Sequence, residues 1–138
     1  MFYNLFKEIQ TAVGTGAPAL KAVQWFNMQY EATITQSPVA FVEFPDDSPA
    51  DHASKDLTRL PVSIRVHVVS KVISSADGTI PDTAIQQAEA LAASVRTALT
   101  GLKPPECKPL RFTGWRHWQR YQGFMITYVD FAAMLNGL

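Results

Sequence analysis

The sequence predicts an α+β domain in which a largely antiparallel sheet packs against two helices. Apolar and polar side chains alternate over residues 62–68, which is typical of a half-buried strand. Apolar residues recur three and four positions apart in residues 2–13 and 83–99, which favours two amphipathic helices. Residues 111–131 have the pattern of a β-hairpin. Helices that flank neighbouring strands in this order indicate a single domain over residues 1–138.

Residues 60–72 are the predicted central strand. The two faces would carry different side chains: Val62, Ile64, Val66 and Val68 on one, and Ser63, Arg65, His67 and Lys71 on the other, with Val69 as the interruption. β-branched residues of this kind suit a pleated, packed surface. We expect the helix at 83–99 to cover the apolar face. We expect Arg65, His67 and Lys71 to lie on a polar face that meets water or another subunit.

The helix ends carry local signals. The first helix has an apolar stripe made of Phe2, Leu5, Phe6, Ile9 and Val13. Residues 14–18 contain two glycines and a proline, so they should end it. Asp82 or Thr83 can cap the second helix, and Thr83 with Gln86 matches a capping box. Gly101 is the predicted stop at its C-terminus.

The other segments predict short strands and loops. Residues 20–30 fit both a helical stripe and an alternating strand, and their aromatic and valine content favours the strand. Residues 39–44 predict a short apolar strand. Residues 46–56 lack apolar periodicity and predict a polar loop. Residues 124–131 predict the last strand, and residues 132–138 a short tail.

The first strand of the hairpin, residues 110–121, is rich in aromatic and basic residues. We expect side chains of one parity to pack in the core and those of the other to lie on the surface. The strip from Trp115 to Tyr121 interleaves cations with aromatic rings. Such a strip is also typical of a nucleic-acid or peptide binding module, which is the alternative function.

The composition limits the classes of function that the chain can have. The chain has 138 residues, 47% of them hydrophobic, which suits one globular domain. Twelve basic and twelve acidic residues cancel, so overall charge gives no reason to bind nucleic acid or membrane. The single cysteine, Cys107, cannot form an internal disulfide or a cysteine-based metal site, which indicates a reducing cytoplasm. We predict no signal peptide, because the N-terminus lacks a basic run before a long apolar core.

No catalytic or cofactor motif is recognisable. The acidic loop holds oxygen and imidazole ligands, but their spacing matches no calcium site, so a solvated loop is the prediction; these residues are Asp46, Asp47, Asp51, His52 and Asp56. A small hydrolase would need Asp46, Asp51, His52 and His67 to converge. His67 and His117 have no partner that the sequence identifies, so both are predicted at a surface or an interface.

Several segments together resemble a known family. They are Asn27-Met28-Gln29-Tyr30-Glu31, then Pro38-Val39-Ala40-Phe41-Val42-Glu43-Phe44, then a polar loop and the strand at 62–68, followed by the helix and the hairpin. In this order they resemble the tail-terminator proteins of long-tailed bacteriophages and prophages. These are also called tail-completion or head–tail joining minor tail components.

The resemblance implies a structural role and not an enzymatic one. Proteins of that family form rings, usually hexameric, that cap the tail tube and present a surface for the head. The implied partners are copies of the same chain, the tail tube and head–tail connector proteins. No cofactor, membrane or specific nucleic acid is implied, apart from DNA that passes through a lumen. The implied location is the virion tail, after assembly in the host bacterial cytoplasm.

Two parts of the chain are candidates for inter-subunit or lumen contacts. The family often has a charged loop that faces the lumen, whereas this chain offers the mixed acidic loop at 46–56. The polar face of the central strand is the second candidate. The predicted interface or lumen residues are Asp46, Asp47, Asp51, Arg65, His67 and Lys71.

Overall fold

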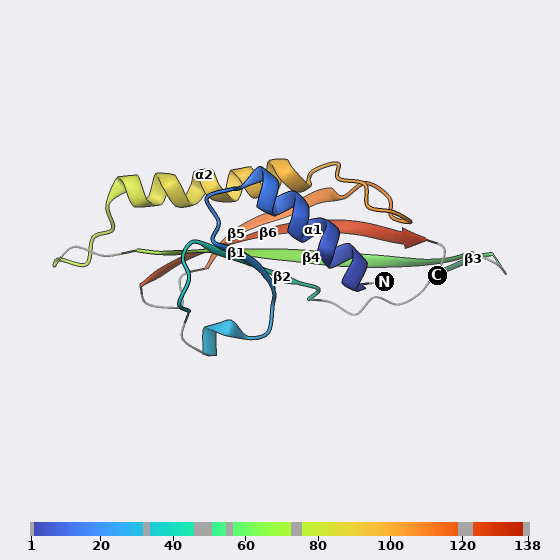
Figure 1. The fold of residues 1–138 in the computed structure, drawn as a ribbon, viewed down its shortest axis with the longest axis horizontal. Helices are drawn as coiled ribbons and strands as arrows, with labels where there is room; N and C mark the ends of the chain where they lie inside the picture. Colours follow the sequence, from blue (N-terminus) through green and yellow to red (C-terminus); the bar gives the residue numbers. More distant parts are fainter. Residues whose placement is uncertain are drawn as a thin grey trace.

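Two helices cover one face of a six-stranded sheet (Figure 1), which confirms the α+β prediction. The structure is a computed structural model that describes residues 2–31, 34–45, 51–54, 57–72, 76–118 and 123–136. Its elements are α1 (Phe2–Gly16), β1 (Ala22–Trp25), the 3-10 turn η1 (Gln29–Glu31), β2 (Val39–Glu43), β3 (Asp51–Ser54), β4 (Leu57–Lys71), α2 (Asp82–Leu99), β5 (Arg111–Trp118) and β6 (Phe124–Asn136).

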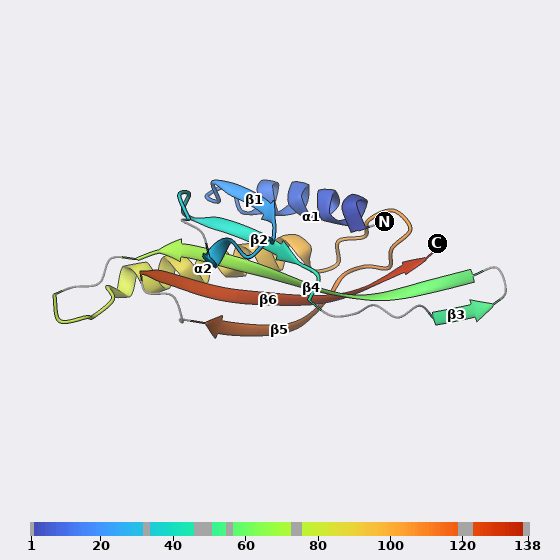
Figure 2. The ribbon, with the colours of Figure 1, turned by 90° about the horizontal axis from the view of Figure 1, so that it is seen from below.

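Strand β4 organises the sheet, in which the strands follow the order β1-β2-β4-β6-β5. Antiparallel pairing with β6 runs from Arg59 opposite Asn136 to Lys71 opposite Phe124. The two strands lie side by side along the length of the molecule (Figure 2). On the other side of β4, β2 pairs with its second half and β3 with its beginning, both antiparallel. The β1–β2 pair is parallel, so the sheet is largely but not wholly antiparallel.

The main core lies between the helices and the sheet. Val62, Ile64, Val66 and Val68 are all buried there. The helices contribute Leu5, Phe6, Ile9 and Val13 from α1, and Ala92, Val95 and Leu99 from α2. The prediction that the second helix covers the apolar face of the central strand is therefore confirmed. Helix α1 shares that role, because its apolar stripe packs into the same cluster.

Close packing of the two helices depends on Gly16, the last residue of α1. A Cβ atom placed on Gly16 would lie 2.6 Å from the Cβ of Ala98 in α2, whereas one placed on Gly14 would meet nothing within 4 Å. Real carbon atoms do not approach to the first distance, so a side chain at Gly16 would force the helices apart. Gly16 thus sets how near α1 lies to α2.

We predict opposite effects for alanine at these two glycines. Gly16→Ala should lower the free energy of unfolding by at least about 1 kcal/mol through overpacking. Gly14→Ala should raise it by up to about 1 kcal/mol, because alanine favours helix over glycine. Urea denaturation of both variants gives the comparison. Ala98→Gly relieves the clash but weakens α2, so it should cost less stability in Gly16→Ala than in the wild type. Equal effects of the two alanines would contradict the assigned contact.

Several predicted boundaries are wrong. The loop predicted at 46–56 contains β3, which pairs with the first residues of β4. The tail predicted at 132–138 belongs to β6 as far as Asn136, because Ala133 and Leu135 are buried opposite Val62 and Leu60. The preference for a strand in residues 20–30 is confirmed for β1, after which the chain forms η1.

Two local predictions are also corrected. The N-cap position of α2 is Pro81, with no side-chain cap hydrogen bond, so the predicted capping box does not form. In β5, the register shifts between Phe112 and Gly114, where the strand has a bulge. Phe112 and Trp115 therefore both pack against the main core, although they differ in parity. The bulge explains why a single parity rule fails along this strand.

Candidate functional site

The sheet face opposite the helices carries a second, smaller core instead of an open polar surface. Its buried residues are Val39, Phe41, Val69, Ile126 and Tyr128. The chain after β1 crosses this face, with η1 on the side of the sheet away from the helices (Figure 1). Phe26, Tyr30 and Ile34 pack against the cluster. Val69, the interruption in the alternation of β4, is thereby explained as a core residue of the second face.

His67 lies in this second core. Its exposure is 2%, so the predicted surface position is wrong for the single chain. The imidazole stacks on the Phe26 ring at 4.4 Å between centroids and meets the edge of the Tyr128 ring at 4.5 Å. Aromatic residues therefore close both sides of the histidine.

Two hydrogen bonds fix the orientation of the His67 ring. Its Nε2 lies 3.0 Å from Oε1 of Glu43, and its Nδ1 lies 2.8 Å from the Tyr30 hydroxyl. A carboxylate only accepts, so the Nε2–H donates to Glu43 and Nδ1 accepts from Tyr30. Burial lowers the pKa of His67, and the hydrogen bond to Glu43 opposes this shift. The histidine is thus neutral near pH 7 and ties η1 to β2 through β4.

Arg65, two residues before His67, is paired within the chain. Its Nε lies 2.9 Å from Oδ1 of Asp130 and its Nη2 3.1 Å from Oδ2, which is a bidentate pair. The guanidinium also lies over the Tyr128 ring, 4.6 Å from its centroid. The hydrogen bond to Asp130 raises the pKa of Arg65. Because Glu43 and Asp130 stand opposite Arg65 on both neighbouring strands, the half-buried cation has acids on each side.

The remaining predicted site residues are spread along the molecule. Asp51 stands opposite Arg59 at one end of β4. Lys71 is exposed at the other end, where its backbone N–H donates to Oγ of Ser37 at 2.7 Å. Asp46 and Asp47 lie outside the described residues. Among the six, the structure brings together Arg65 and His67, and their interface or lumen role stays a prediction.

The hydrolase alternative lacks the required convergence. His52 pairs with Thr58, nine residues from His67 along β4, which is about 30 Å at the rise of an extended strand. Asp51 is only one position nearer, and Asp46 lies outside the described residues. A general base must reach its partner within hydrogen-bond distance. His67 itself is buried, between Tyr30 and Glu43, which are both half-buried.

The aromatic strip from Trp115 to Tyr121 is not a continuous platform over its described part. Trp115 packs against the main core, whereas Arg116 is exposed and stands opposite Tyr128 of the second face. His117 is exposed, and its Nδ1 lies 3.1 Å from the Thr127 hydroxyl. The strand therefore divides these side chains between its two faces, which does not suit stacking of successive bases. Residues 119–121 of the strip lie outside the described residues.

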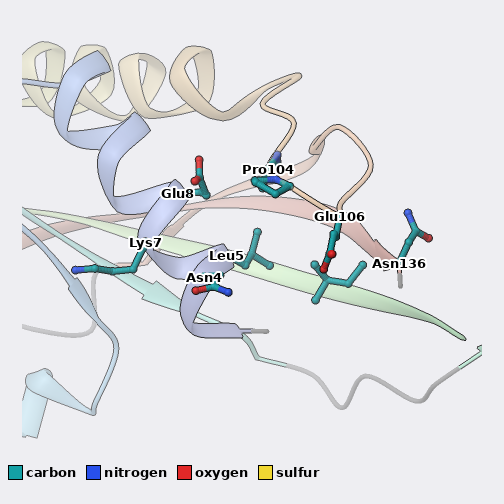
Figure 3. Close-up of a pocket in the computed structure, with 9 residues that line it drawn as sticks. Asn4, Leu5, Lys7, Glu8, Pro104, Glu106 and Asn136 are labelled. Carbon is teal, nitrogen blue, oxygen red and sulfur yellow. The ribbon is translucent and has the colours of Figure 1, made fainter. Parts of the chain in front are cut away.

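A surface hollow of about 310 Å³ lies between the start of α1, the loop at 104–106 and the end of β6 (Figure 3). Leu5 points into it from α1, Lys7 points away, and Glu106 approaches from the loop. Over the described part of the chain, no three acidic, histidine or cysteine side chains gather in a way that suits a metal ion.

The sequence interpretation missed the side chains that surround His67 and Arg65. These are Phe26, Tyr30, Glu43, Tyr128 and Asp130. One signal was available. Val39 and Phe41 of β2 and Val69 of β4 are apolar residues on the face that the alternation of β4 assigns to polar side chains. Strand β2 is therefore apolar on both sides over residues 39–42, which indicates a sheet that is covered on both sides there.

The fold is an α+β domain in which His67 and Arg65 form hydrogen bonds to side chains of the same chain. The family model described as "Phage tail terminator protein" matches residues 9–135. The chain therefore belongs to the phage tail terminator family and is a structural protein of the virion tail, as the resemblance predicted.

The fold is shared with a solved virion component. A chain from the structure titled "Virion of native gene transfer agent (GTA) particle" superposes with a TM-score of 0.61 at 17% identity. The match covers 93% of this chain and 94% of the other. At this identity the likeness concerns the fold. No curated protein matches the sequence. Within the described ranges, neither helix is long and apolar enough to cross a membrane.

Proposed function

We propose that the protein forms a homo-oligomeric ring, such as a hexamer, that terminates the phage tail tube and joins it to the head. The observation that carries this proposal is the presence of two different outer strands in one sheet. In the described part of the chain, β1 pairs only with β2 and β5 pairs only with β6. A closed ring requires head-to-tail contacts, in which each copy uses two different surfaces. The two sheet edges supply such surfaces.

The proposed partners are other copies of the chain, the tail tube and the head–tail connector. The ring would form in the bacterial cytoplasm during virion assembly. The end of the molecule that carries β3 extends past the helices (Figure 1), and the acidic segment with Asp46, Asp47 and Asp51 adjoins this end in the sequence. We place these aspartates, together with Lys71 at the opposite end of β4, among the contacts to neighbouring subunits or to the lumen.

The test uses purified tail tubes that lack a terminator. The protein should bind at the tube ends as a ring visible by electron microscopy, and sedimentation velocity over a concentration series should reveal any ring formed in solution. Tubes incubated with an unrelated domain of equal size provide the control. Bare tube ends, together with a monomer at every concentration, would overturn the proposal.

A further inference from the structure

Exposed large apolar side chains lie on the outer strand β1, on the turn that follows it and on α1, which contacts β1. Tyr3 is 65% exposed, Trp25 46% and Met28 53%, and in the described part of the chain Ile85 is the one other large apolar residue in this class. Trp25 ends β1, its ring lies 5.4 Å from that of Phe6, and Tyr3 lies on the same helix as Phe6. We name Tyr3, Trp25 and Met28 the aromatic edge. Exposed apolar and aromatic groups of this size are typical of contact surfaces.

The backbone holds the end of this edge in place. Met28 has φ 56°, a left-handed conformation that is uncommon for a side chain of this size. The Gln29 side chain donates to the carbonyl of Trp25 at 2.8 Å and accepts from the N–H of Asn27 at 2.6 Å. The fixed turn presents Met28 to solvent next to β1. A surface that is already ordered loses less entropy when a partner binds.

The opposite edge of the sheet has complementary chemistry. Arg111 and Arg116 of β5 are exposed, and we name them the basic edge. Strand β5, with the sequence RFTGWRHW, carries these two arginines and no acidic residue. Two copies that met through this edge would place like charges together. The edge therefore favours a different surface as its partner.

We propose that the basic edge of one copy docks on the aromatic edge of the next, an inference that rests on the proposed ring. Arginine binds aromatic faces through its flat cation. The chain already uses this contact internally, with Arg65 over Tyr128 at 4.6 Å and Arg96 over Phe112 at 4.1 Å. Strand β1 and helix α1, which carry Trp25 and Tyr3 of the aromatic edge, lie along one long side of the molecule. Strand β5 lies along the other (Figure 2). Repetition of this contact is head-to-tail, as ring closure requires.

The test separates the two halves of the contact. Trp25→Ser damages the aromatic edge, and Arg111→Glu with Arg116→Glu damages the basic edge. Each variant alone should remain monomeric in sedimentation velocity and should fail to cap tail tubes. An equimolar mixture should form a one-to-one pair, because each variant retains the half that the other lacks. This pair should not close into a ring.

Matched variants control for folding and for general charge. Tyr3→Ser with Met28→Asn removes exposed area without touching the packing of Trp25, and asparagine tolerates a positive φ. This double variant should behave as Trp25→Ser does. Ile85→Ser and Lys103→Glu change exposed side chains outside both edges and should assemble as the wild type does. Circular dichroism checks that each variant is folded.

The outcomes distinguish the edge assignment from the ring itself. Rings that persist in all edge variants, or folded single-edge variants that do not pair when mixed, would overturn the assignment and leave the ring intact. Loss of assembly in Lys103→Glu would also overturn it, in favour of general charge attraction. A wild-type chain that neither associates in solution nor caps tubes would overturn both proposals.

Discussion

Replacing Phe41 by alanine is expected to lower the free energy of unfolding by about 3–5 kcal/mol. Phe41 belongs to β2 and is fully buried in the second core, where its ring lies 6.0 Å from Tyr30 and 6.4 Å from Phe26. The substitution removes a large apolar side chain and leaves a cavity that the sheet cannot close. Urea denaturation monitored by circular dichroism measures the change.

The matched control for this prediction is Ile85→Ala, which removes an exposed apolar side chain from α2. It should change stability by no more than about 0.5 kcal/mol. If Phe41→Ala had an effect as small as this control, the face opposite the helices would be an ordinary surface. The chain from Phe26 to Ile34 would then not be part of the folded core.

Acidification is expected to destabilise the protein through His67. The pKa of His67 is lowered in the folded chain, chiefly by burial, so below pH about 6.5 the unfolded chain binds more protons than the folded one. This contribution is fully present above that pH. It is lost as the pH falls towards the folded pKa, by up to about 1.4 kcal/mol per pH unit. The charged or titratable groups around His67 are Tyr30, Glu43, Arg65, Tyr128 and Asp130.

The measurement is the stability of wild type and His67→Gln between about pH 7 and pH 5, the range in which an ordinary histidine titrates. His67→Gln should be less stable near neutral pH, because Tyr30 and Glu43 lose a shared partner, but its stability should fall less steeply on acidification. His117→Gln, on the exposed part of β5, is the matched histidine substitution for comparison. Equal slopes in wild type and His67→Gln would contradict the role of His67.

The face of the sheet under the helices could be predicted because its pattern is local. Alternation over four residues of β4 and the stripes on α1 and α2 each lie within one element, so periodicity alone identifies them. The helices then have one apolar surface available to cover. The same reasoning predicted the order of the main elements; the family was suggested by a resemblance, which rested on that order and on segments such as Pro38–Phe44.

The second face could not be predicted because its contacts are distant in the sequence. His67 meets Tyr30 across 37 residues and Glu43 across 24. The covering segment begins at Phe26, where the pattern fitted both helix and strand. When another segment covers a polar residue, the alternation of polar and apolar residues along its strand is the same as for an exposed one. Val69, like Val39 and Phe41 of β2, was a local sign that this face was covered.

Strand β3 and the end of β6 were missed for a related reason. The residues of β3, Asp51–Ser54, are mostly polar and become a strand because β4 extends far enough to pair with them. The bulge in β5 similarly changes which side chains face the core without a signal in composition. The extent of these strands and the position of the bulge depend on the strands they pair with. The intrinsic preference of the residues for strand has little influence on them.

The position of β4 also has a consequence for how the sheet opens. Over residues 65–69 this strand pairs with a neighbour on each side, and a core packs on each face, so the amides there can exchange with solvent only when much of the domain unfolds. The outer strands have one neighbour each, and β1 is only four residues long. Local stability therefore decreases from the middle of the sheet to its two edges. In the proposed ring, a neighbouring copy would cover the least stable strands of each subunit. Assembly would therefore raise the local stability of the outer strands, which is lowest in the single chain.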